Sequence, residues 1–82
     1  MCPDFVLELA SESDSVSVLQ SKMREYIANG ARLGWLIVPK SGWVEIYRSD
    51  QSVERLDAPK IISGESVLPG FVMPVEIIFW SS

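Results

Sequence analysis

The sequence predicts an α/β domain in which a strand-helix-strand crossover is followed by a β-hairpin and short edge strands. Two nearly continuous apolar runs, Phe5–Leu9 and Leu33–Val38, are typical of buried parallel strands. The residues between them are polar at first and then carry apolar side chains at helical spacing, which is the order of a parallel crossover. With 82 residues, the chain is long enough for one small domain.

The first strand, Phe5–Leu9, is expected to be covered on both faces, and Glu8 is the exception in its apolar run. An ionised carboxylate inside such a strand needs a cation, a metal ion or several hydrogen-bond donors beside it. The alternative is a shorter strand, or one at a sheet edge, with Glu8 in contact with water. The residues alone leave both interpretations open.

A helix is predicted after the polar stretch 11–15, in which Asp14 or Ser15 is the expected N-cap. The apolar side chains that follow recur at helical spacing and form one stripe: Val16, Leu19, Met23, Tyr26 and Ile27. Asn29 and Gly30 then provide a stop signal.

Lys22 lies at the edge of this stripe, so its stem would run over the sheet and its ammonium group could reach a strand end. There it is a plausible partner for Glu8. The alternative is a lysine that only covers the margin of the core.

The second half of the chain is predicted to extend the sheet. Trp43–Arg48 follows a short turn and alternates in polarity, which indicates a hairpin strand with one face in water. Residues 53–56 are expected to form a short edge strand. Residues 61–73 are interpreted as irregular, and residues 74–80 as one helical turn with proline at its start.

The composition excludes several kinds of site. The chain has no histidine and a single cysteine, Cys2, so imidazole-based catalysis, an internal disulfide and a thiolate zinc cluster are excluded. Ser11 and Ser13 are therefore interpreted as capping residues. The net charge of −4 argues against a non-specific nucleic-acid coat protein. We expect a cytoplasmic protein with no membrane partner, since no apolar run approaches the length of a span.

The order and spacing of these segments resemble one family over nearly the whole chain. The matching pieces are 3–11 (PDFVLELAS), Lys22 with Tyr26, 30–37 (GARLGWLI), 46–48 (IYR), 63–65 (SGE) and 68–71 (LPGF). With these residues the chain resembles the Uma-two family of restriction endonucleases, within the PD-(D/E)XK nuclease superfamily.

The resemblance implies a restriction-endonuclease-like core, DNA as the partner and Mg²⁺ as the cofactor of phosphodiester hydrolysis. It further implies that Glu8 is a catalytic carboxylate and metal ligand. Lys22 would be the catalytic lysine, which stabilises the charge that develops on the phosphate.

One departure from the family concerns its first helix and two strands, the second of which carries another metal-binding aspartate. Residues 1–82 lack a counterpart, so we expect a single partial domain that is truncated and inactive alone. Asp4 cannot replace the aspartate, because it lies roughly 13 Å from Glu8 along the same strand. If the chain alone cuts DNA and Glu8→Ala does not, the second carboxylate comes from a source such as Glu12, Asp14 or a partner chain. The competing hypothesis is a non-catalytic interaction module that pairs its strands with a second copy or a complementing chain.

Overall fold

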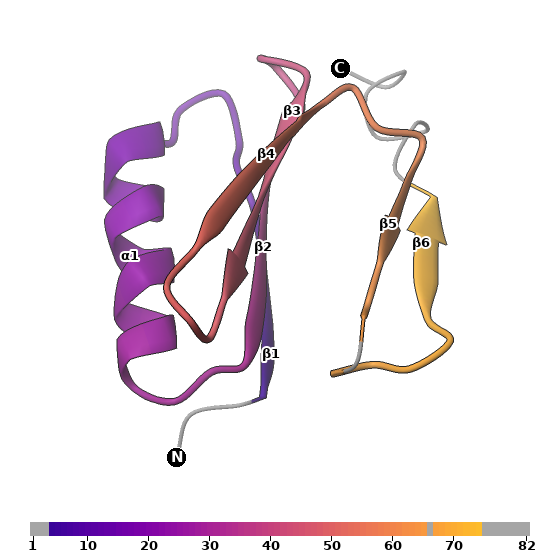
Figure 1. Ribbon diagram of the computed structural model, residues 1–82. Helices are drawn as coiled ribbons and strands as arrows, with labels where there is room; N and C mark the ends of the chain where they lie inside the picture. Colours follow the sequence, from indigo (N-terminus) through magenta and orange to yellow (C-terminus); the bar gives the residue numbers. More distant parts are fainter. Residues whose placement is uncertain (1–3, 66, 75–82) are drawn as a thin grey trace.

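The computed structural model describes residues 4–65 and 67–74, which form three layers (Figure 1). Its elements are β1 (Phe5–Leu9), α1 (Val16–Ala28), β2 (Leu33–Val38), β3 (Trp43–Arg48), β4 (Val53–Asp57), β5 (Ile61–Ser63) and β6 (Val72–Pro74). Helix α1 covers one face of the sheet β1–β4, and the β5–β6 ribbon lies on the other side. The predicted α/β class is confirmed. No helix in these residues is long and apolar enough to cross a membrane.

The four-stranded sheet has the order β1-β2-β3-β4. β1 pairs with β2 in parallel, as expected for strands joined through a helix, and the other two pairings are antiparallel. In this register Glu8 lies opposite Leu36, which in turn lies opposite Glu45. Among the strands that the structure describes, β1 and β4 are therefore the edge strands, and β2 and β3 are central.

Helix α1 packs on the sheet through the predicted stripe. Met23 and Ile27 are buried, and the other members pack partly buried against the same cluster. The close approach of helix and sheet depends on Gly34 in β2, because a Cβ atom there would lie 2.6 Å from Met23 Cε. The helix ends as predicted at Asn29, and Gly30 follows with a φ of +110°.

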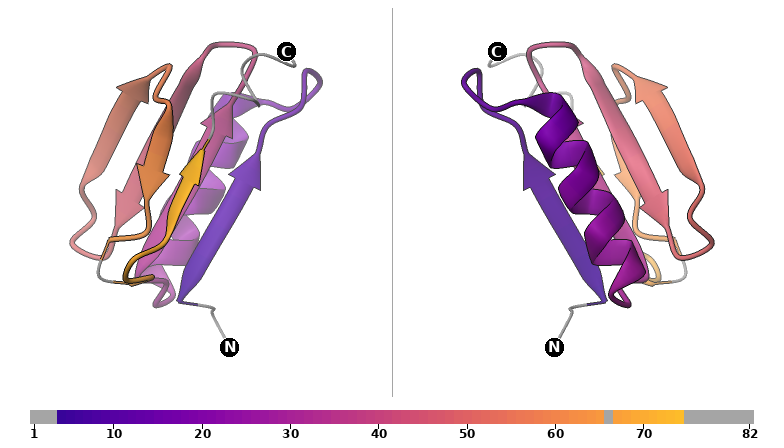
Figure 2. Two further views of the ribbon diagram at one scale, coloured as in Figure 1. Left: turned by 90° about the vertical axis from the view of Figure 1, so that its right-hand side faces the viewer. Right: turned by 90° about the vertical axis from the view of Figure 1, so that its left-hand side faces the viewer.

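The opposite face of the sheet forms a second core beneath the β5–β6 ribbon. Figure 2 shows this ribbon on the side of the sheet away from α1. Trp35 is fully buried at the centre of this core, edge-to-face with Phe5 at 4.9 Å and stacked on Phe71 at 6.2 Å between ring centroids. Ile62 of β5 is buried in the same cluster. This packing attaches the ribbon to the sheet.

Two burial predictions were wrong. β1 is not covered on both faces, because it is an edge strand: Leu7 and Leu9 are 40% and 52% exposed. β3 has no wet face, because α1 covers one side and the ribbon the other. Glu45 and Tyr47, which were expected to face water, are only 7% and 2% exposed.

The interpretation of residues 61–73 as irregular was also wrong in part. Apolar residues on both sides of a turn pair as β5 and β6 and bury Ile62 against the sheet. Pro74, which was expected to start a helical turn, is the last residue of β6. The rest of the predicted turn, residues 75–80, lies outside the described residues.

Candidate functional site

The carboxylate of Glu8 and the ammonium group of Lys22 form an ion pair, with Lys22 Nζ 3.1 Å from Glu8 Oε1. Glu8 is the fourth residue of β1 and shares with Val6 the face of the strand that α1 covers. The side chains are 24% and 48% exposed, so the pair is accessible from solvent. The predicted approach of these two residues is confirmed.

Tyr26 is a third member of this cluster. Its hydroxyl group donates a hydrogen bond of 3.4 Å to Glu8 Oε1, and its ring centroid lies 5.8 Å from Lys22 Nζ. The sequence analysis placed Tyr26 in the apolar stripe and assigned no contact to its hydroxyl group. The sequence did contain an indication that Tyr26 lies beside Lys22, because Tyr26 follows Lys22 by four residues and residues four apart on a helix are neighbours.

The hydrogen bond from Lys22 to Glu8 is the main cause that raises the pKa of Lys22, with a smaller contribution from Tyr26. Lys22 therefore remains a cation at neutral pH. It can hold an anion, and it cannot accept a proton as a general base there.

The loop before α1 brings another carboxylate near this cluster. Asp14 Oδ2 accepts hydrogen bonds from the backbone N–H and the hydroxyl group of Ser11, at 2.8 and 3.0 Å. These bonds lower the pKa of Asp14, and the charge of Lys22 lowers it further. Ser15 occupies the N-cap position, and its side chain makes no capping hydrogen bond to the helix backbone. Asp14 therefore closes the preceding turn, and Ser11 bonds to it within that turn.

The donor set accommodates Mg²⁺ only in part. In the described ranges, no three or more Asp, Glu, His or Cys side chains gather as a metal cluster. Glu8 offers one carboxylate, and Mg²⁺ in proteins is often held by one or two carboxylates, with water and substrate phosphate as the other ligands. The cluster is therefore suited to weak binding that substrate would strengthen.

A second polar cluster, which the sequence analysis missed, is centred on Glu45 of β3. Its carboxylate accepts hydrogen bonds from Gln20 (2.9 Å), Tyr47 (2.8 Å) and Arg55 (3.0 Å). Burial by itself would raise the pKa of Glu45, but the three bonds and the charge of Arg55 lower it overall. Burial, followed by the bond to Glu45, raises the pKa of Tyr47. This cluster is closed by its own partners and has a structural role.

The comparison with protein families identifies the chain. A family model, Uma2, described as "Putative restriction endonuclease", matches residues 1–76. The chain belongs to the Uma2 family. No curated protein matches it.

A solved structure has the same fold as this Uma2 chain. It is titled a "putative nuclease belonging to DUF820" from Anabaena variabilis, and the two are 24% identical with a TM-score of 0.78. The alignment covers 94% of the Uma2 chain and 44% of the Anabaena chain. The Uma2 chain thus spans less than half the length of this structural neighbour, and the predicted restriction-endonuclease-like core is confirmed at the level of the fold.

Proposed function

We propose that the chain carries part of a Mg²⁺-dependent DNA endonuclease site, with Glu8 as the metal ligand and Lys22 as the phosphate-binding cation. The observation that carries the proposal is the ion pair of these two side chains at 3.1 Å, on a solvent-accessible strand-to-helix junction. Membership of the Uma2 family and the nuclease title of the structural neighbour support the reaction class.

In this mechanism, Glu8 would hold the metal ion, which when bound would supply Lewis-acid activation of the phosphate and of a water molecule. Lys22 turns from Glu8 to a non-bridging phosphate oxygen, where its positive charge stabilises the charge of the transition state. Tyr26 keeps the Glu8 carboxylate oriented through its hydroxyl group. A second carboxylate would come from Glu12, Asp14 or a partner chain.

The metal site can be tested without any reaction. Mn²⁺ added to the ¹⁵N-labelled chain is expected to broaden the amide signals around Glu8, and to do so much less in Glu8→Gln. Asp57→Asn removes an exposed carboxylate on β4, at the opposite edge of the sheet from β1, and serves as the matched control. Equal broadening in the wild type and in Glu8→Gln would overturn the assignment of Glu8.

Cleavage is tested on supercoiled plasmid with Mg²⁺. The chain alone is expected to give no measurable nicking, because one carboxylate leaves the ion held mainly by water. Nicking is expected once the part of the Anabaena protein without a counterpart here is fused to the chain, and Glu8→Ala and Lys22→Met should abolish it. If the chain alone cuts and Glu8→Ala does not, the proposed inactivity is wrong and the second carboxylate belongs to the chain.

A second candidate function is a non-catalytic interaction module. The exposed side chains of Leu7 and Leu9 on edge strand β1 favour it, because an apolar edge strand pairs readily with another chain. A chain that binds no Mn²⁺ near Glu8 but associates through β1 would have this function in place of the first.

A further inference from the structure

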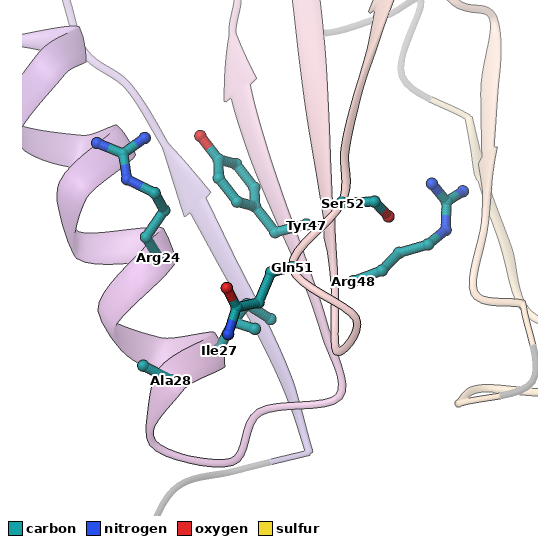
Figure 3. A pocket seen from close by; sticks show the side chains of 7 residues that line it. All are labelled: Arg24, Ile27, Ala28, Tyr47, Arg48, Gln51 and Ser52. Atoms are coloured by element: carbon teal, nitrogen blue, oxygen red, sulfur yellow. The ribbon is translucent and has the colours of Figure 1, made fainter.

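A recess lies between α1 and β3, on the flank of the helix away from Glu8. It has a volume of about 280 Å³ and extends from the C-terminal half of α1 to the turn between β3 and β4 (Figure 3). Lys22 and Arg24 are two residues apart on α1 and so point to different flanks of the helix. Lys22 reaches β1, whereas Arg24 borders this α1–β3 recess beside Tyr47.

The floor of the α1–β3 recess is apolar. It consists of Ile27 and Ala28 from α1 and Tyr47 from β3, and Ile27 and Tyr47 are almost fully buried. The hydroxyl group of Tyr47 already donates to Glu45 and is not a free donor for a ligand, and the exposed part of the floor is mainly Ala28. Such a floor suits a flat ring more than a hydrated ion.

The rim of the recess carries positive charge from Arg24. Its guanidinium group makes one hydrogen bond, of 3.4 Å to Ser21 Oγ, and no ion pair within the described ranges. Arg48 also borders the recess, but in Figure 3 its guanidinium group points to the other side of the sheet, where it pairs with Glu54 and Glu65. Arg24 is therefore the group available to an anion.

Opposite Arg24, the amide group of Gln51 lies over the floor (Figure 3). The backbone of Gln51 has a φ of 71°, which residues other than glycine, asparagine and aspartate rarely adopt. Glycine would fit this turn without strain, and it would leave the recess without its second polar group.

We propose that the α1–β3 recess binds a single nucleoside monophosphate, with its phosphate on Arg24, its base on the apolar floor and the edge of the base on Gln51. An anionic group, a flat ring and a polar ring edge are the three features that the recess matches. The inference rests on the proposed function, since the nucleotide is the unit of its substrate. The source is either a free nucleotide or the phosphorylated end of a DNA strand.

The test is a titration of the ¹⁵N-labelled chain with deoxyadenosine 5′-monophosphate, followed by NMR. Signals of residues 24–28 and 47–52 are expected to shift. Deoxyadenosine or inorganic phosphate alone should bind at least about tenfold more weakly, as each loses one set of contacts. A 5′-phosphorylated single strand that binds when the free nucleotide does not would identify the strand end as the source and support the proposal.

Four variants separate this site from its surroundings. Arg24→Gln is expected to weaken binding about tenfold, whereas Arg32→Gln, an exposed arginine outside the recess, should not change it. Gln51→Gly removes the side-chain amide group and allows the positive φ at this position without strain. The affinity for the nucleotide should therefore fall, while the melting temperature should not. Glu8→Gln should leave nucleotide binding intact, so failure of the nuclease proposal and failure of this one are distinguishable.

Three results would overturn the proposal. They are inorganic phosphate binding as tightly as the nucleotide, unchanged binding in Arg24→Gln, and the absence of shifts with both the nucleotide and the phosphorylated strand at millimolar concentration.

Discussion

Glu45 is a carboxylate that stabilises the fold only while it is ionised, because all three of its partners donate hydrogen bonds to it. Its pKa in the folded protein lies below the ordinary value of 4.5. The unfolded chain therefore takes up the proton first as the pH falls. The contribution of Glu45 is fully present above about pH 4.5 and is lost as the pH drops through the lower pKa of the folded state.

The first prediction concerns Glu45→Gln, which keeps the size of the side chain but removes its charge and one acceptor oxygen. We expect a loss of about 2 kcal/mol in the free energy of unfolding at pH 7, because a donor facing the new amide group is left without a partner. The difference from the wild type should shrink below pH 4.5. Urea unfolding at several pH values measures it, with Glu12→Gln as the exposed control. A difference that stays constant down to pH 3 would contradict the role of the charge.

Glu8 and Glu45 also show what the sequence can predict at single residues. The sequence could predict that Glu8 and Lys22 approach each other, because Glu8 interrupts an apolar strand and Lys22 borders the apolar stripe of the helix. The burial of Glu45 could not be predicted, since an acidic residue that alternates with Val44 and Ile46 has the pattern of a wet strand face. Only the tertiary contacts with α1 and with Arg55 on β4 bury it.

At the level of elements, α1 and β2 approach closely at Gly34. An added Cβ atom would lie 2.6 Å from Met23 Cε and 3.0 Å from Val6 Cγ2. Met23 Cε is the far end of a flexible side chain, but Met23 is fully buried, so its movement requires the surrounding core to shift.

The second prediction is a double-mutant cycle at this contact. Gly34→Ala is expected to cost about 1–3 kcal/mol through overpacking, and Met23→Ala about 2–5 kcal/mol through the cavity that it leaves. The double variant should be more stable than the sum of both losses implies, by on the order of 1 kcal/mol, because the new methyl group enters the cavity. Thermal unfolding followed by circular dichroism measures all four proteins, and strict additivity would show that the two sites are not in contact.

The elements differ in how well the sequence predicts them, for a physical reason. α1 and the strands β1, β2 and β3 have the predicted bounds, because their periodic patterns end at glycine, proline or polar turns. The ribbon β5–β6 was missed, because three-residue strands have too few positions for a period to be visible. Burial was wrong where it depends on strand order, which puts β1 at the edge and β3 inside.

At the level of the whole molecule, β1 leaves an apolar edge on one side of the sheet. In the part of the chain that the structure describes, β1 has one neighbouring strand, β2. The β1 side chains Leu7 and Leu9 are 40% and 52% exposed. The one charged side chain of β1 is already paired with Lys22. Little therefore opposes pairing of this edge with another strand.

The third prediction is that the purified chain associates through β1 at micromolar concentration. Leu9→Lys should shift it to a monomer in light scattering, because a lysine on an edge strand opposes strand pairing. Val18→Lys adds the same charge at a 63% exposed apolar position on α1 and should leave association unchanged. A monomeric wild type with a cooperative melt well above body temperature would contradict both the association and the expectation of a partial domain.

The sheet order β1-β2-β3-β4 repeats the order of the strands in the chain, and β5 pairs with β6. Each strand can therefore find its partner in the next segment of the polypeptide, and the longest excursion is the one through α1. Small loops close at low entropic cost, so a topology of this kind folds quickly, on the order of milliseconds for a mixed α/β domain. During translation the growing chain can add its hairpins one after another, without waiting for a distant segment to emerge from the ribosome.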